Sequence, residues 1–156
     1  MSTITEMKDT INTKTANLVL LTIATAGIYP IIWLFLNTQK LEEITSKKIA
    51  DNTFLIALAV CIGIGGAFSN LGNQTLDIIS GLLSIASAAL YIIWSFKAKS
   101  ALEEYALAEH KTDLRMNGFY TFFLSVYYIN YCINDLPEAQ RKQQILAGGQ
   151  ETTVES

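Results

Sequence analysis

The residues of this chain that could carry out catalysis are few and poorly placed for it. The only histidine, His110, lies between Glu109 and Lys111, where a solvated surface histidine is the simplest interpretation. Two acidic pairs, Glu42-Glu43 and Glu103-Glu104, consist of adjacent residues. Because neighbours on a helix point about 100° apart, the carboxylates of each pair do not converge as an acid and a base.

The cysteines and the known motifs supply no other reaction chemistry. Cys61 and Cys132 fit neither a metal-binding spacing nor a disulfide framework, and we expect both to be small buried residues. The chain contains no nucleophile elbow, zinc-protease motif or phosphate-binding glycine loop. We therefore expect no enzyme activity, no metal and no cofactor. A net charge of −3 provides no basic surface, so nucleic acid is not an expected partner.

The best candidate for a binding site combines polar and aromatic residues near the end of the last apolar stretch. Tyr127 and Asn130 lie in the second half of the span, and Asn134 lies at its end. In a medium without water, each needs a hydrogen-bond partner. They form either an aromatic belt with bonds between helices or a site for a lipid or ring-bearing ligand. Trp33 and Trp94 are further candidates for binding.

These residues lie in or beside long stretches without charge. Uncharged runs of 25, 25, 19 and 19 residues follow Lys14, Asp51, Asp77 and Arg115. About 20 apolar residues of helix cross a hydrocarbon core about 30 Å thick. The 16% charged residues also fall below the roughly 25% of a soluble domain. We predict an all-α membrane protein with four transmembrane helices and the bilayer as its surroundings. The expected segments are a polar N-terminal segment (1–15), spans at 16–36, 53–68, 78–96 and 116–133 within a membrane domain (16–136), and a flexible tail (137–156).

Two alternatives to this architecture are weaker. The first apolar run resembles a secretory signal peptide, because Ala24-Thr25-Ala26 imitates a cleavage site. The run continues to Leu36, however, which is too long for a signal core. Pro30 near its middle should kink the helix or mark where it leaves the bilayer. A soluble bundle is the other alternative, but 156 residues leave too little chain to cover four apolar helices.

Small residues recur every four positions in the second and third spans. This spacing lets helix backbones approach closely, and we expect these residues to pack helix against helix. The alternatives are a glycine-lined pathway and a pore lined by hydroxyl groups. The residues concerned are Ala57, Cys61 and Gly65 in one row, Gly63 and Ala67 in another, and Ser80 and Ser84 in the third span.

A shift of 61 residues aligns the chain with itself. Residues 31–35 then match 92–96, and Leu-Glu-Glu at 41–43 matches 102–104, with seven identities over 13 positions. The identities include both tryptophans. We predict two tandem helix–connector–helix repeats in parallel orientation, with amphipathic connectors in the membrane interface.

The stretch Gly27-Ile28-Tyr29-Pro30-Ile31-Ile32-Trp33, with its Leu-Glu-Glu connector, resembles a known family. That family consists of small bacterial multi-span membrane proteins of unknown function with a Gly-Ile-Tyr-x-x-x-Trp signature. Residues 127–134 are similar to the family's closing segment. The second repeat departs from the signature, since Ala88 and Leu90 replace the Gly and the Tyr. The resemblance implies a multi-pass protein, in keeping with a bacterial inner membrane, and implies no activity.

The positions of Lys and Arg indicate, by a small margin, how the protein is oriented in the membrane. Seven lie in the two connectors and four in the terminal segments. Because cytoplasmic loops are enriched in Lys and Arg, we expect cytoplasmic connectors and both termini on the opposite side. The function that we predict is a helical packing or interaction module, associating as a homo-oligomer or with a larger membrane partner. The alternatives are an oligomeric transporter or channel for a small solute and a binder of lipid or aromatic ligands.

Overall fold

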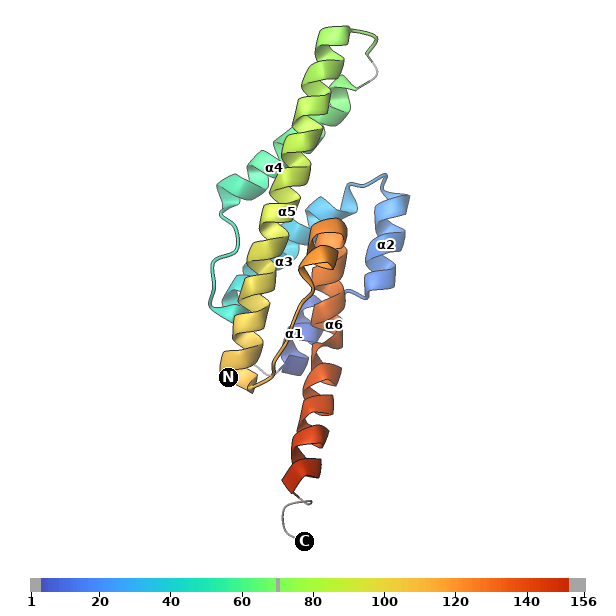
Figure 1. Cartoon of the computed structure of the whole chain (residues 1–156). Coiled ribbons are helices and arrows are strands. Elements are labelled where there is room, and N and C mark those ends of the chain that lie inside the picture. The colour runs from blue at the N-terminus through green and yellow to red at the C-terminus, as the bar shows by residue number, and fades with distance from the viewer. Residues whose placement is uncertain (1–3, 70, 152–156) are drawn as a thin grey trace.

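A computed structural model describes residues 4–69 and 71–151, and its regular structure there is entirely helical. Helices α4 and α5 form a long antiparallel hairpin that extends beyond the rest of the molecule, while α1, α3, α6 and the second half of α5 pack together at the opposite end (Figure 1). The helices are α1 (Ile4–Ile11), α2 (Thr15–Ala24), α3 (Tyr29–Thr45), α4 (Asn52–Phe68), α5 (Gln74–His110) and α6 (Gly118–Glu151).

The first predicted span is divided into two helices. α2 ends at Ala24 and α3 begins at Tyr29. Between them Ala26 and Gly27 have positive φ angles of 50° and 90°, which turn the chain back. Pro30 lies in the first turn of α3, where a missing N–H is tolerated. Residues 16–36 therefore form most of a helical hairpin and not the continuous helix that we expected.

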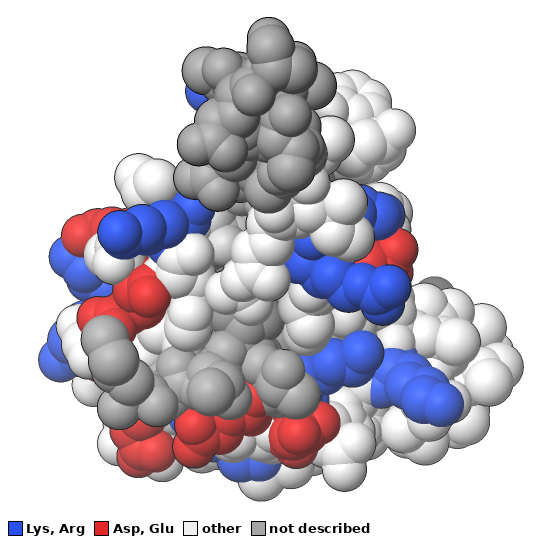
Figure 2. Space-filling view, turned by 90° about the horizontal axis from the view of Figure 1, so that it is seen from below, with Lys and Arg blue, Asp and Glu red and all other residues white. Residues whose placement is uncertain are grey.

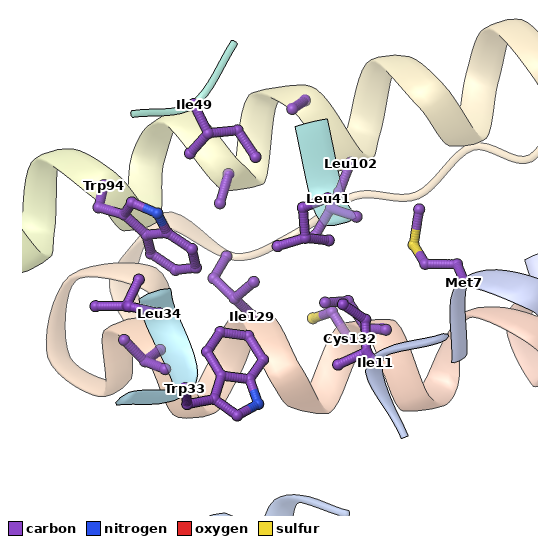
Figure 3. Close-up of a cluster of buried hydrophobic side chains, with 14 of the residues drawn as sticks. Met7, Ile11, Trp33, Leu34, Leu41, Ile49, Trp94, Leu102, Ile129 and Cys132 are labelled. Carbon is purple, nitrogen blue, oxygen red and sulfur yellow. The ribbon is translucent and has the colours of Figure 1, made fainter. Parts of the chain in front are cut away.

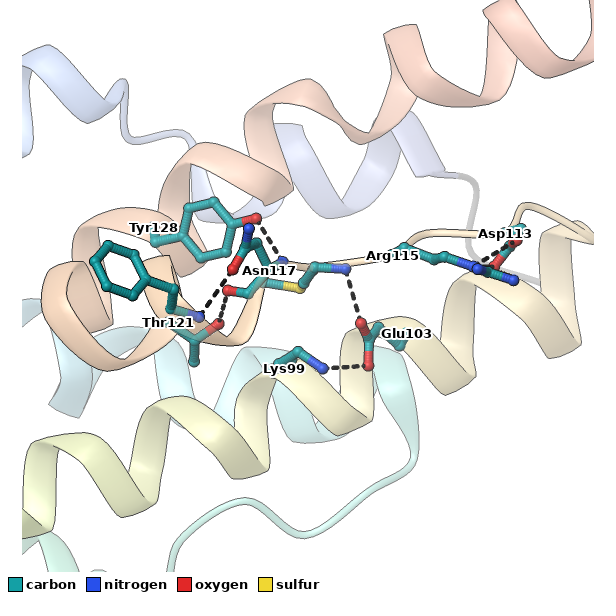
Figure 4. Close-up of polar contacts among 9 residues, drawn as sticks. Lys99, Glu103, Asp113, Arg115, Asn117, Thr121 and Tyr128 are labelled. Carbon is teal, nitrogen blue, oxygen red and sulfur yellow. Dashed lines mark hydrogen bonds and ion pairs between the residues drawn. The ribbon is translucent and has the colours of Figure 1, made fainter.

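The fourth predicted span is divided as well. Ser125, with φ 41° and ψ −114°, separates a first limb of α6 (118–124) from a second limb (126–151). The two limbs fold back on each other. The Asn117 N–H, just before the first limb, donates to the hydroxyl of Tyr128 on the second limb at 2.9 Å (Figure 4). The rings of Tyr120 and Tyr128 also lie 5.7 Å apart, whereas eight residues of straight helix span about 12 Å. Residues 116–133 thus form a second helical hairpin.

The second limb of α6 does not end at Pro137. It continues to Glu151, so most of the predicted flexible tail (137–156) is helical, and only residues 152–156 lie outside the described residues. A contact from another segment supports this part of the limb. The Asp113 N–H donates to Gln143 Oε1, and Gln143 Nε2 donates to the Asp113 carbonyl, each at 3.1 Å.

The terminal segments and the connectors lie at the same end of the molecule. Lys40 Nζ donates to the carbonyl of Thr10 at 3.2 Å, although these residues precede and follow the first apolar stretch. A complete crossing would place them on opposite sides of a core about 30 Å thick. The expectation that the termini lie opposite the connectors is therefore wrong, because the first and the last apolar segments both double back.

The predicted amphipathic connectors are the C-terminal halves of α3 and α5. Leu41 and Leu102, which are equivalent in the 61-residue alignment, are both buried. Their apolar stripes face the protein core and not a membrane interface (Figure 3). All six helices contribute residues to this core, among them Met7 and Ile11 of α1, Leu18 of α2, Trp33, Leu34 and Leu41 of α3, Leu55 and Leu58 of α4, Trp94, Ala98 and Leu102 of α5, and Ile129 and Ile133 of α6.

Candidate functional site

Three of the candidate binding residues, Tyr127, Asn130 and Asn134, lie on the second limb of α6, and all three contact the N-terminal part of the chain. Asn130 and Asn134 each donate from Nδ2 to the carbonyl of Thr13 at 2.9 Å. The Tyr127 hydroxyl donates to Thr22 Oγ1 at 3.1 Å. Their polar groups therefore hold α6 against α2 and the residues before it.

An apolar groove of about 520 Å³ lies beside these contacts. Two of the tyrosines that line it direct their hydroxyls to partners in the chain, Tyr127 to Thr22 and Tyr128 to the N–H of Asn117. The groove thus presents ring faces and aliphatic groups, which suit an acyl chain or an apolar ring better than a polar solute. Its lining consists of Thr15, Val19, Tyr120, Leu124, Tyr127, Tyr128 and Tyr131.

A second groove, of about 400 Å³, brings the turns of both hairpins next to α5. Gly27 and Pro30 of the first turn and residues 122–127 around the second turn line it, together with Ala88, Tyr91 and Ile92 of α5. Both turns therefore lie beside the same short stretch of α5. This stretch is inside the uncharged segment that follows Asp77.

Trp33 and Trp94 contact each other inside the core. Their ring centroids are 6.1 Å apart with an angle of 84° between the planes, and each side chain is buried. Trp94 Nε1 donates to Thr38 Oγ1 at 3.1 Å, whereas Trp33 Nε1 is buried with no partner in the described chain. Neither tryptophan offers a free surface to a ligand.

One row of small residues packs α4 against α5. A Cβ added to Gly65 would lie 3.3 Å from the Cβ of Leu83, and Ser80 Oγ donates to the Gly65 carbonyl at 2.6 Å. Cys61, one turn earlier, is partly buried. Ser84 donates back to the Ser80 carbonyl at 2.9 Å. These hydroxyls are thus engaged within the hairpin.

The other row faces away from α5. Gly63 and Ala67 are one turn apart and exposed, and a Cβ added to Gly63 would meet nothing within 4 Å. Ala57 is exposed as well, although we grouped it with Cys61 and Gly65. Large apolar neighbours, Ile56 and Val60, share this outer face. It has no partner among the described residues.

The turn between α2 and α3 leaves none of its N–H groups without an acceptor. The Thr25 side chain is central, because its Oγ1 donates to the Leu21 carbonyl and accepts the Tyr29 N–H. Pro30, which follows, has no N–H. Four backbone N–H groups donate to backbone carbonyls: Thr25 to Leu21 (2.9 Å), Ala26 to Ile23 (3.2 Å), Gly27 to Thr22 (2.8 Å) and Ile28 to Thr25 (3.2 Å). The Tyr29 N–H donates to Thr25 Oγ1 (2.9 Å).

The first glutamate of each Leu-Glu-Glu segment binds the connector that follows it. Glu42 Oε1 accepts the N–H groups of Ile49 and Ala50 at 2.7 and 2.8 Å. Glu103 Oε1 accepts the N–H of Met116 at 2.8 Å (Figure 4). Two residues at equivalent positions therefore fix the chain after α3 and after α5, which gives these carboxylates a structural role.

Charged side chains surround the end of the molecule that is opposite the α4–α5 turn (Figure 2). Lys47 pairs with Glu104 at 2.7 Å. The hydrogen bond and ion pair between Lys48 and Asp51 lower the pKa of the Asp51 carboxyl and raise the pKa of the Lys48 amine. Both groups are exposed, so this pair marks a charged boundary just before α4 and not a reactive centre.

His110 is less solvated than the sequence indicated. It is half-buried, and its Nε2 lies 3.0 Å from the Tyr105 hydroxyl, with the two rings edge to face. Among the residues that the structure describes, no group of three or more His, Cys, Asp or Glu side chains could hold a metal ion.

Comparison with known proteins identifies one family. A family described as a domain of unknown function, DUF4234, matches residues 13–104, which is more than half of the chain. The chain therefore belongs to this family. The match includes α2 to α4, both tryptophans and both Leu-Glu-Glu segments, and it ends before α6. Neither the curated proteins nor the solved structures contain a match.

Proposed function

We propose that this protein is a membrane-anchored interaction module, held in the bilayer by the α4–α5 hairpin. One observation carries the proposal: α5 is long and apolar enough to cross a membrane, yet only 6% of its most apolar 18-residue window is buried. The core helix of a soluble protein would be mostly buried. α4 has 17 residues and a length of about 25 Å, which also suffices for a crossing.

The charges support two complete crossings. With the N-terminal segment, the connectors and the second limb of α6 at one end, all 11 Lys and Arg lie on that side of the proposed bilayer. The turn between α4 and α5 carries none. A bias of eleven to none favours a cytoplasmic location for the charged end and for both termini.

The outer face of α4 is the proposed interaction surface. Gly in a helix is less favourable than Ala by about 1 kcal/mol, and Gly63 has no packing role within the chain. Gly63 and Ala67 form a small-xxx-small pair, which allows a second helix to approach closely in lipid. The partner that we propose is the same face of a second copy, and a larger membrane protein is the alternative.

Transport of a solute has less support. The hydroxyls that could line a pore are engaged elsewhere, since Ser80 donates to Gly65 and Ser84 to Ser80. The large groove next to α2 is apolar. A lipid chain suits that groove, which agrees with membrane anchoring and requires no separate function.

The anchor is tested by labelling single cysteines in sealed vesicles, after Cys61 and Cys132 are replaced by alanine. Asn12→Cys and Ser46→Cys should react from the same side, and Leu71→Cys from the opposite side. Four crossings would instead place Asn12 and Ser46 on different sides, and that result would overturn the two-crossing anchor.

The interface is tested separately by cross-linking in mild detergent and in vesicles. Gly63→Leu should reduce the cross-linked dimer strongly. Gly81→Leu is the matched control, because Gly81 is an equally open glycine on α5 whose neighbours four residues away, Asp77 and Ile85, are not small. Equal cross-linking of both variants would exclude the outer face of α4 as the interface.

A further inference from the structure

We propose that the two short hairpins enter only the half of the bilayer next to the charged end, so that the protein is a wedge that prefers membranes curved outward on that side. The N-terminal hairpin is α2 with the start of α3 (15–36), and the C-terminal hairpin is residues 118–133. The acyl chains of that one leaflet contact the outer surfaces of both hairpins. This inference rests on the proposed anchoring by α4 and α5.

The length of each hairpin sets how deep it reaches. α2 has 10 residues and the first limb of α6 has seven, which correspond to about 15 and 10 Å. Neither can cross a core of about 30 Å. Both turns line a groove with Ala88, Tyr91 and Ile92 of α5. Since the proposed crossing by α5 extends over about 76–96, the turns lie roughly 6–12 Å inside the boundary at Lys97, within the half of the bilayer next to the charged end.

The first turn is suited to a medium without water. In lipid, an unsatisfied backbone N–H is costly, and each N–H from Thr25 to Tyr29 has an acceptor within the chain. The side chains around it are apolar and outward-facing, including Ile23, which is 73% exposed. A turn on a water-exposed surface would need neither property.

The second turn also exposes apolar side chains to its surroundings. Phe123 is 65% exposed, and Phe122 and Leu124 on either side are exposed too. At the turn itself, Ser125 Oγ donates to the Phe122 carbonyl at 3.4 Å, and the Tyr127 hydroxyl joins the two hairpins by donating to Thr22 Oγ1. The two turns are thus linked to each other and present apolar groups to their surroundings.

Cations mark where each inserted segment begins. Lys14 immediately precedes α2, Arg115 lies three residues before α6, and Lys97 directly follows the apolar part of α5. At the headgroup level these side chains face anionic lipid phosphates, which favours this depth. In both hairpins and in α5, the boundary between the charged part and the inserted part therefore lies at the same depth.

The consequence is an unequal cross-section. The half of the bilayer next to the charged end holds α2, α3, α4, α5 and both limbs of α6, whereas the other half holds α4 and α5 alone. Each helix is about 10 Å wide with its side chains. Helices inserted into one leaflet respond to curvature because they occupy area in that leaflet only.

The experiment measures protein density on single vesicles of different size. The full chain, with a fluorescent tag at its C-terminus, is reconstituted into a mixture of small and large phosphatidylcholine–phosphatidylglycerol vesicles. Trypsin added outside identifies the molecules whose charged end faces outward, since all 11 Lys and Arg lie at that end. These molecules should be enriched about twofold or more per membrane area on small vesicles, and inward-facing molecules should not.

Variants separate the wedge from the anchor. The double variant Ile23→Asn with Phe123→Asn changes exposed tip residues and should abolish the enrichment, while resistance to carbonate extraction and the helical circular dichroism spectrum are retained. Ile145→Asn, at a similarly exposed site near the C-terminal end of α6, should keep the enrichment. Equal density on all vesicles, or enrichment that survives the double change, overturns the wedge and leaves the anchor intact. Release of the unmodified chain by carbonate overturns both.

Discussion

Trp33 and Trp94 are 61 residues apart, occupy equivalent positions in the two matching segments, and contact each other edge to face with their ring centroids 6.1 Å apart. The contact joins α3 to α5 inside the core, before the first Lys of each helix, Lys40 and Lys97. Only one of the two indoles has a hydrogen-bond partner in the described chain. This asymmetry distinguishes the two residues experimentally.

Trp94→Phe should destabilise the protein more than Trp33→Phe. The first change removes the bond from Nε1 to Thr38, which contributes about 1 kcal/mol. The second removes a buried N–H that has no partner, so its cost is limited to lost packing. Thermal unfolding of both variants in the same detergent measures the difference. Equal melting temperatures would contradict the assigned roles.

Glu42→Ala should loosen the connector between α3 and α4. The carboxylate holds two N–H groups, and hydrogen bonds to a charged group contribute about 1.5–3 kcal/mol each. Hydrogen exchange at Ile49 and Ala50 should therefore accelerate. Glu42→Gln keeps an acceptor oxygen and should restore part of the protection. The exposed neighbour Glu43 is the control, and faster exchange in Glu43→Ala would argue against a specific role for Glu42.

Gly65→Leu and Gly63→Leu should differ in their effects on the stability of the single chain and on its association. The first places side-chain atoms where Leu83 already lies, and overpacking of this kind costs about 1–3 kcal/mol. The second points into open space and should leave the stability of the single chain unchanged while reducing association. Melting temperature and cross-linking, measured on the same preparations, distinguish the two. A lower melting temperature for Gly63→Leu would show that this glycine packs within the chain.

Thr25→Val should destabilise the turn between α2 and α3. Valine has nearly the same shape but cannot accept the N–H of Tyr29, and leaving that donor unsatisfied costs about 1–3 kcal/mol. Thr25→Ser keeps the hydroxyl and should behave like the original. Limited trypsin digestion after Lys14 reports on the loosening. Identical digestion of the Val and Ser variants would mean that the hydroxyl has no role in the turn.

Much of the secondary structure follows from the sequence. Long uncharged stretches rich in apolar residues predict helices, and Lys40 and Lys97 mark where two of these stretches end. Tyr127, Asn130 and Asn134 follow at spacings of three and four, so their contacts with one neighbouring segment could have been expected from helix geometry. The first reversal also has a local signal, because Gly27 favours a positive φ and Pro30 favours the start of a helix. A break between those two residues could have been expected.

The second reversal has no such signal. Ser125 lies between Leu124 and Val126, without glycine or proline nearby, and its unusual backbone angles are accompanied by distant contacts such as that of Asn117 with Tyr128. The sequence likewise gives no sign that Thr10 meets Lys40. Periodicity and composition act over a few turns of helix and determine which segments are helical and apolar. Whether an apolar segment runs straight or doubles back depends on partners far along the chain, and only the tertiary structure decides it.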